Sequence, residues 1–268
     1  MADDARAPVY EDLHAHQLVG QEARNRASAH RILPLLFERH RPASLLDVGC
    51  GLGTWLSVAR ELGVGDLQGV DGPWLQPELS RFPVEHIRVL DLEQSFDLGR
   101  RFDLVVCLEV AEHLSPEAAP GFVASLARHA DVILFSAAIP HQGGHHHVNE
   151  RFPEYWRDLF AAEGCVALDF LRPRVWTDEA VLPWLRQNLL VFARRELARD
   201  GGPFAGLEAK EPLALVHPEM YLARLQALEP VAQEHALLMQ HLLAGRTVSA
   251  SRNPDGAVVL HVAGPART

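Results

Sequence analysis

Lysine and cysteine are both scarce in this sequence. Its 268 residues include a single lysine, Lys210, and three cysteines, at positions 50, 107 and 165, that form no Cys-x-x-Cys pair. Scattered cysteines argue against a disulfide framework and a zinc knuckle, and they suit a reducing, cytoplasmic location. The formal net charge of −10 implies no broad cationic surface, so binding to nucleic acid is not expected.

Long apolar runs are also lacking. The longest, such as "VALDFL" and "NLLVFA", are far shorter than the ~20 residues that a membrane-spanning helix needs. The opening "MADDARAPVYEDLHAH" has no apolar stretch, so we expect neither a membrane segment nor a secretory signal. An apolar content of 48% and a charged content of 22% are ordinary for a globular protein with a buried core.

What the sequence does contain, from Ser44 onward, is a series of short apolar runs separated by helical stretches. This alternation is typical of βα units on a parallel sheet. We predict helices near 55–63, 116–129 and 153–163, and a weak one in the proline-rich segment 73–81. Predicted strands cover residues 44–49, 67–71, 87–92, 102–109, 131–137, 165–171 and 188–195.

Both ends of the chain differ in pattern from this middle part. Residues 10–40 have apolar positions at helical spacing, with an interruption or kink expected at Pro34. Beyond a linker-like loop, an amphipathic helix is predicted over 218–245, followed by a hairpin over 247–262 that turns at "NPDG". The predicted organisation is an N-terminal helical cap (1–40), a central domain (41–199) and a C-terminal helix and hairpin appendage (200–268).

The segment "LLDVGCGLGTW", residues 45–55, carries the strongest functional signal. An apolar strand runs into Gly49, Gly51 and Gly53 and then directly into a helix. Glycine is needed where the backbone turns sharply and approaches a ligand closely. Taken alone, such a loop suits a dinucleotide, a nucleoside or only a tight turn.

Acidic residues after the next two predicted strands narrow the choice. Asp71 follows the second strand, where a carboxylate can accept hydrogen bonds from ribose hydroxyls. Asp91 follows the third strand, where an acid can meet an adenine amino group and Leu92 offers a main-chain donor. Ligands of open α/β sheets bind outside the carboxyl ends of the strands, so these groups are expected to share one site.

Together these motifs resemble class I S-adenosylmethionine-dependent methyltransferases over roughly residues 40–195. The matching motifs are D-V-G-C-G-L-G, an acid after the second strand, D-L after the third and E-V-x-E-H-L after the fourth. The resemblance implies a Rossmann-like, seven-stranded, mostly parallel sheet that binds S-adenosylmethionine. It also implies that the methionine and ribose parts are wrapped by Gly49, Cys50, Gly51 and Gly53.

The remaining cofactor contacts are implied by the same resemblance. Asp71 would bind the ribose hydroxyls, and Asp91 and Leu92 would lie at the adenine. Glu109, at the end of the fourth strand, completes the predicted cofactor set. Trp74 either stacks on the adenine or is a plain core aromatic residue.

A nicotinamide dehydrogenase is the main alternative for the glycine loop. Its fingerprint, G-x-G-x-x-G, would place a glycine or alanine at position 54, where this chain has Thr54. A Tyr-x-x-x-Lys catalytic pair is also missing, since the chain's single lysine is Lys210. The methyltransferase interpretation is therefore favoured.

Two carboxylates and a histidine, Glu109, Glu112 and His113, lie close together where the fourth strand ends. Such a mixed set of oxygen and nitrogen donors suits magnesium, manganese or a related ion. The stretch is similar to ubiquinone-pathway O-methyltransferases and to small-RNA 2′-O-methyltransferases. In the second group a histidine after strand five completes a metal site that grips vicinal hydroxyls.

A histidine-rich loop, "HQGGHHHVNE" at 141–150, occupies that position here. His147 is the predicted fourth ligand, with His145 and His146 as alternatives. If no metal binds, the segment is instead a solvated polar loop. A neutral histidine is also a suitable base near pH 7, so His113 and His147 are the candidate catalytic residues. Whether a divalent cation binds is left open at this point.

The segment after this loop is similar to bacterial methyltransferases of glycan and natural-product pathways. The predicted function is therefore O-methylation of a hydroxyl on a small molecule. The alternatives are RNA 2′-O-methylation, against which the lack of a basic stripe counts, and a noncatalytic scaffold with the same fold. Whether the C-terminal appendage makes a homodimer contact is left open.

Overall fold

The computed structural model describes residues 7–244, 246–252 and 258–265. The chain divides between His217 and Pro218 into two compact units, which we describe one after the other. Among the residues described, no helix combines the length and the apolar character needed to cross a bilayer.

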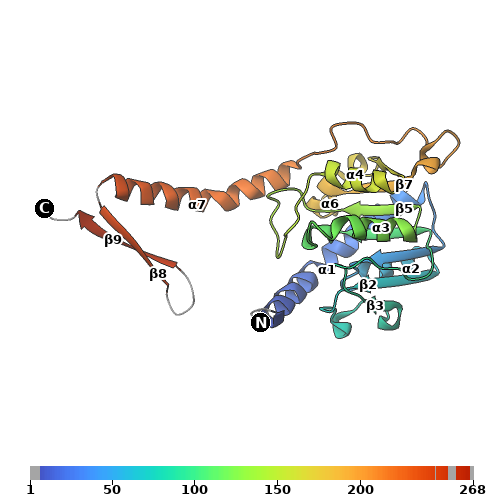
Figure 1. The fold of residues 1–268 in the computed structure, drawn as a ribbon, viewed down its shortest axis with the longest axis horizontal. Coiled ribbons are helices and arrows are strands. Elements are labelled where there is room, and N and C mark those ends of the chain that lie inside the picture. Colours follow the sequence, from blue (N-terminus) through green and yellow to red (C-terminus); the bar gives the residue numbers. More distant parts are fainter. Residues whose placement is uncertain (1–6, 245, 253–257, 266–268) are drawn as a thin grey trace. The chain divides into compact units, whose positions relative to one another are not determined.

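The first unit is built on a seven-stranded sheet (Figure 1). The strands lie side by side in the order β3-β2-β1-β4-β5-β7-β6. Strand β7 is antiparallel to both neighbours, and the other adjacent pairs are parallel. This Rossmann-like sheet confirms the predicted fold class. Its strands are β1 (Ser44–Val48), β2 (Asp66–Asp71), β3 (Ile87–Val89), β4 (Leu104–Leu108), β5 (Val132–Ser136), β6 (Cys165–Leu168) and β7 (Leu190–Arg194).

Helices cover both faces of the sheet. Within β4, Val106 packs in the core cluster that includes residues of α1 and α2, whereas Val105 packs in the cluster that includes residues of α3 and α4. Since neighbouring side chains of a strand point to opposite faces, these two helix pairs lie on opposite faces. A strand covered on both faces is apolar throughout. The helices are α1 (Ala7–Phe37), α2 (Thr54–Glu61), α3 (Ala119–His129), α4 (Pro153–Ala162), α5 (Arg172–Val175) and α6 (Pro183–Asn188).

Several helical details differ from the prediction. α1 continues through Pro34, which lies only one turn before its end at Phe37, so little of the helix depends on the hydrogen bond that proline cannot make. The proline-rich segment 73–81 forms only a 3₁₀ turn, η1 (Pro77–Leu79). Helix α6, which ends at Asn188 directly before β7, was not predicted.

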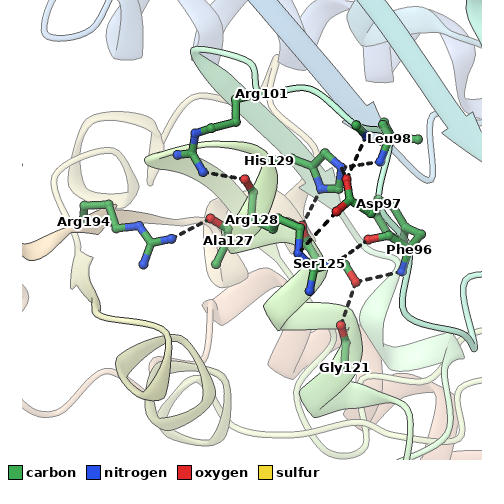
Figure 2. Close-up of polar contacts among 11 residues, drawn as sticks. Phe96, Asp97, Leu98, Arg101, Gly121, Ser125, Ala127, Arg128, His129 and Arg194 are labelled. Atoms are coloured by element: carbon green, nitrogen blue, oxygen red, sulfur yellow. Dashed lines mark hydrogen bonds and ion pairs between the residues drawn. The ribbon is translucent and has the colours of Figure 1, made fainter.

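A buried histidine fixes the end of α3 (Figure 2). The Nε2 atom of His129 accepts a hydrogen bond from the N–H of Leu98 at 2.9 Å, and Nδ1 lies 2.6 Å from the carbonyl oxygen of Ser125. Because a main-chain N–H can only donate, the proton of the neutral ring is on Nδ1. Arg101 and Arg194 donate to carbonyl groups of the last turn, which have no partner within the helix.

The second unit contains one long helix and a hairpin. Helix α7 (Pro218–Leu243) includes Pro230, and strands β8 (Arg246–Arg252) and β9 (Val258–Pro265) pair antiparallel. The helix and the two strands confirm that a C-terminal appendage is present, but this unit begins at Pro218 and not at residue 200. The predicted "NPDG" turn lies outside the described residues.

Candidate active site

The predicted site residues follow strands that end at one edge of the sheet. The glycine loop follows β1, Asp71 ends β2, Glu109 follows β4, and the histidine loop follows β5. Strand β7 runs the opposite way, so its start lies at this edge and places α6 there too. Residues that are far apart in the sequence are therefore gathered by the topology of the sheet.

The glycine loop needs its glycines for two separate reasons. Gly49, Gly51 and Gly53 all have left-handed backbone conformations, with φ of 75°, 53° and 73°, which side chains disfavour. Space is the second reason. A Cβ on Gly49 would lie 2.3 Å from a methyl group of Val110, and one on Gly53 would lie 2.7 Å from the Cβ of Phe82.

Asp71 joins the end of β2 to this loop. Its side chain is buried, with one carboxylate oxygen accepting a hydrogen bond from Gly51 N–H at 2.5 Å and the other from Gly72 N–H at 2.6 Å. Burial raises the pKa of Asp71, and these two hydrogen bonds oppose the rise. The carboxylate therefore organises the loop, and its role at ribose hydroxyls stays a prediction.

Asp47, within β1, is a buried acid that the sequence analysis did not single out. Its Oδ2 atom has no hydrogen-bond partner among the residues described. Burial, and then the charge of Asp71, raise the pKa of Asp47 well above its usual value. A carboxylate in the apolar run "LLDV" was the available signal. Buried, unsatisfied polar atoms beside a glycine loop suit a polar ligand.

The other predicted cofactor residues differ in burial and in contacts. The ring of Trp74 lies on Gly72, where an added Cβ would be 2.2 Å from it, and this position favours neither of its two predicted roles. Asp91 is exposed and accepts a hydrogen bond from the N–H of Glu93, whereas Leu92 is buried. The Cys50 thiol is buried and its pKa is raised well above the usual value, chiefly by that burial.

Glu112 and His113, which follow β4, lie together with His147, which follows β5. Each offers one ligand atom, and these atoms are all within 4.8 Å of one another. The two imidazole rings have centroids 4.8 Å apart and planes at 87°. The N–H groups of Val148 and Asn149 donate to the carbonyl oxygen of Glu112 at 2.9 and 3.0 Å. The histidine loop is thus attached to the turn η3 (Ala111–His113).

The carboxylate of Glu112 is the unusual group of this cluster. It is fully buried, and neither oxygen has a hydrogen-bond partner in good geometry among the residues described. Burial, and then the neighbouring Glu109 carboxylate, raise the pKa of Glu112 well above its usual value; the amides of Glu112 and Ala138 oppose this less strongly. Burying an unpaired carboxylate is costly, and a divalent cation with oxygen and nitrogen ligands would remove that cost.

Glu109, which was also predicted as a ligand, lies beside the cluster and is held by amide groups. Asn188 Nδ2 donates to its Oε1 at 3.1 Å, and Gln142 Nε2 donates to its Oε2 at 3.0 Å. Its φ of 54° is rare for a residue other than glycine, and such strain is concentrated at functional sites. Burial raises the pKa of Glu109, and hydrogen bonds from Asn188, Ser136 and Gln142 limit the rise.

His147 is the histidine of the three that the structure places in this cluster. Its Nδ1 lies 3.0 Å from Oε1 of Glu150, and its ring lies against Gly144, where a Cβ would be 2.2 Å from Nε2. His145 and His146 are exposed. The structure thus favours the first of the three alternatives for the fourth ligand.

Three amide residues at this edge were missed by the sequence analysis. Gln142 accepts hydrogen bonds from Asn188 at 2.9 Å and from Gln187 at 3.1 Å. No spacing rule points to Gln187 and Asn188, because α6 reaches the edge only through the antiparallel direction of β7. The adjacent polar residues "QN" before an apolar strand were the one available signal.

Comparison with known proteins gives a family and several similar folds. The family model described as "Methyltransferase domain" matches residues 21–175. Among solved structures, DesVI of Streptomyces venezuelae has a TM-score of 0.53 at 20% identity, covering 68% of this chain and 97% of that chain. An O-methyltransferase family protein from Burkholderia thailandensis has a TM-score of 0.52 at 13% identity, covering 72% of this chain and 61% of that chain. No curated protein matches the chain.

Strand order, glycine loop and acid at the end of β2 define a class I S-adenosylmethionine-dependent methyltransferase. The family model covers more than half of the sequence, so the chain belongs to the methyltransferase-domain family. DesVI and the Burkholderia protein are each less than 25% identical to this chain, and they show the fold alone.

Proposed function

We propose that this enzyme methylates a hydroxyl group of a small, polyhydroxylated acceptor, such as a sugar or a natural-product intermediate, with the help of a divalent cation. The observation that carries the proposal is the cluster of Glu112, His113 and His147 at the carboxyl edge. Glu109, beside this cluster, is also proposed as a ligand. The buried Glu112 carboxylate, whose oxygens have no hydrogen-bond partner in good geometry among the residues described, supports a cation there.

Apart from Glu109, the proposed cofactor residues lie at or after the ends of strands β1, β2 and β3. Gly49, Cys50, Gly51 and Gly53 are proposed to surround the methionine and ribose parts of S-adenosylmethionine. Asp71 and Trp74 would lie at the ribose and adenine, Asp91 and Leu92 at the adenine, and Glu109 near the sulfonium end. When bound, S-adenosylmethionine supplies an electrophilic methyl group that is displaced in line, so the protein has mainly to align a nucleophile with it.

The acceptor atom is inferred from the chemistry of the cluster. A neutral amine already has a nucleophilic lone pair, whereas a hydroxyl becomes a good nucleophile only as it loses its proton. A neutral histidine can take that proton, and a bound cation would lower the pKa of the hydroxyl and fix its orientation. A cluster with both kinds of group therefore favours oxygen over nitrogen as the methylated atom.

The proposal is tested by assaying methyl transfer to a panel of sugars, aminosugars, phenols and a short RNA. Product analysis by NMR then identifies the methylated atom. We expect O-methyl products, loss of turnover after chelation and recovery with manganese, magnesium or cobalt. Exclusive N-methylation would contradict the oxygen assignment, and turnover unchanged by chelation would remove the cation and leave His113 and His147 as candidate bases.

A further inference from the structure

The two ring nitrogens of His147 have different surroundings. Nδ1 lies 3.0 Å from Oε1 of Glu150, and Nε2 lies on the side of the ring that packs against Gly144. A neutral imidazole has one N–H group and one lone pair, and the partner of one nitrogen decides which atom has which. The lone pair is the part of the ring that binds a cation or takes a proton.

Glu150 accepts hydrogen bonds from the loop at both of its oxygens. Besides its contact with His147, Oε1 accepts from Gly143 N–H at 2.9 Å, and Oε2 accepts from His141 N–H at 2.7 Å. Main-chain N–H groups can only donate, so both oxygens act as acceptors. The remaining short contact, to Nδ1, is then satisfied when Nδ1 carries the proton.

This arrangement also fixes the orientation of the ring. The side chains of His147 and Glu150 are only 12% and 18% exposed, so water competes little for their hydrogen bond. The ring of His113 packs edge to face against His147, and Gly144 also packs against this ring, where an added Cβ would lie 2.2 Å from Nε2. Carboxylates that receive the second N–H of a ligating histidine orient the ring and increase its basicity.

We propose that Glu150 is a positioning residue that holds His147 in the Nδ1–H tautomer, so that Nε2 offers its lone pair to the Glu112–His113 cluster. The inference deepens the proposed function. It rests on that function for whether Nε2 binds a divalent cation or takes a proton from the acceptor hydroxyl. It assigns Glu150 no contact with the acceptor or the cofactor. Its effect is transmitted through one imidazole ring.

The tautomer can be measured directly, without cation, cofactor or acceptor. Long-range ¹H–¹⁵N NMR spectra of the whole protein, at a mildly alkaline pH at which histidines are neutral, separate protonated from unprotonated ring nitrogens. The signals of His147 are assigned by their loss in His147→Gln. We expect a protonated Nδ1 and an unprotonated Nε2. A protonated Nε2 in the native protein would overturn the proposal.

The variant Glu150→Gln tests whether Glu150 is the cause. Glutamine has nearly the same shape, and its amide group can donate a hydrogen bond to Nδ1, which would allow the proton to move to Nε2. We therefore expect the Nε2–H tautomer to become populated in this variant. An unchanged tautomer in folded Glu150→Gln would show that other contacts set it, contrary to the proposal.

A second measurement uses Mn²⁺ binding, followed by the loss of its free-ion EPR signal. Removing a carboxylate that orients a ligating histidine weakens metal binding by about 10- to 100-fold, and we expect this range for Glu150→Gln. The matched control is Glu154→Ala, because Glu154 accepts a hydrogen bond from the N–H of Ala214 and belongs to neither the cluster nor the loop. The control is expected to bind as the native protein does.

The two hypotheses can fail separately. If the native protein binds no Mn²⁺, the cation in the proposed function is wrong, and the NMR spectra still decide the tautomer. If the native protein binds Mn²⁺ and Glu150→Gln binds it equally well, the positioning role of Glu150 is wrong while the cation stands.

Discussion

At the residue scale, Gly144 shows how a small residue can serve a larger one. Its backbone conformation is open to any residue, yet an added Cβ would lie 2.2 Å from Nε2 of His147. The need for glycine therefore comes from the histidine ring and not from the turn. Gly143, with φ of 76°, is constrained by conformation instead.

Replacing Gly144 with alanine is expected to displace the ring of His147 while leaving the fold intact. Because a shift of about 1 Å at a reacting group can lower turnover by about 100-fold, we expect kcat to fall by about 10- to 100-fold. Gly65→Ala is the matched control, since no atom of the described residues, apart from Gly65 and its two chain neighbours, lies within 4 Å of its added Cβ. Equal kcat values for the two variants would contradict the packing argument.

Asp71→Asn tests the acid at the end of β2. The variant replaces one acceptor oxygen with an N–H donor that would face the N–H of either Gly51 or Gly72. Leaving such a buried pair unsatisfied costs about 1–3 kcal/mol, so we expect lower stability in urea and weaker binding of S-adenosylmethionine by calorimetry. Native-like values of both would exclude Asp71 as the organiser of the loop.

At the scale of secondary-structure elements, α6 and the histidine loop meet through side-chain amides. Asn188 donates both to Glu109 and to Gln142, so the two elements position one carboxylate together. Neither element contacts the glycine loop through these bonds. The arrangement predicts energetic coupling between Gln142 and Asn188, which are 46 positions apart in sequence.

A double-mutant cycle on kcat/KM measures this coupling. Asn188→Ala and Gln142→Ala share a hydrogen bond, so their effects are expected to be non-additive by about 0.5–3 kcal/mol. Asn188→Ala combined with Arg100→Ala is the control, because Arg100 forms an exposed ion pair with Asp66 and should combine additively. Additive effects in both pairs would show that the amides act independently.

The contact between α3 and the segment before β4 predicts a pH dependence of stability. Burial lowers the pKa of His129 in the folded protein, so between that pKa and the unfolded value of about 6.5 the unfolded chain binds more protons. Stability is then complete above about pH 6.5 and falls as the pH drops below it. Denaturation of the native protein and of His129→Asn should diverge most above this pH; parallel curves would contradict the prediction.

Elements with a local sequence pattern could be predicted, whereas contacts made only by tertiary structure could not. The seven strands are predictable because each is a short apolar run, and the glycine loop because Gly49, Gly51 and Gly53 follow such a run directly. The amides of α6 are not predictable, since only tertiary structure brings Asn188 to Glu109. For the same reason sequence reasoning could not distinguish His147 from His145.

At the scale of the whole molecule, the boundary between the two units lies where the methyltransferase fold ends, at His217. The sheet and its covering helices end before Pro218, and Leu213 and His217 are still buried in the first unit. The central domain predicted to end at 199 would therefore omit residues that pack in that unit. Buried residues such as Phe204 have no periodic pattern to reveal them.

A chain ending at His217 is expected to fold and to bind S-adenosylmethionine. A chain ending at residue 199 should be less stable, because it lacks the buried side chains of Phe204 and Leu213. Truncating a buried phenylalanine to alanine lowers the free energy of unfolding by about 3–5 kcal/mol, and truncating a buried leucine lowers it by about 2–5 kcal/mol. Thermal unfolding and cofactor titration of both chains measure this difference. Equal stability of the two would contradict the boundary.

The direction of β7 has a consequence for how this enzyme diversifies. The proposed cofactor residues, apart from Glu109, lie between positions 49 and 92, whereas the cluster, the histidine loop and α6 lie between 109 and 188. Exchange of one continuous stretch of coding sequence would therefore replace the residues proposed to bind the acceptor and leave most of those proposed to bind the methyl donor intact. Recombination between related genes has a natural crossover point in β4.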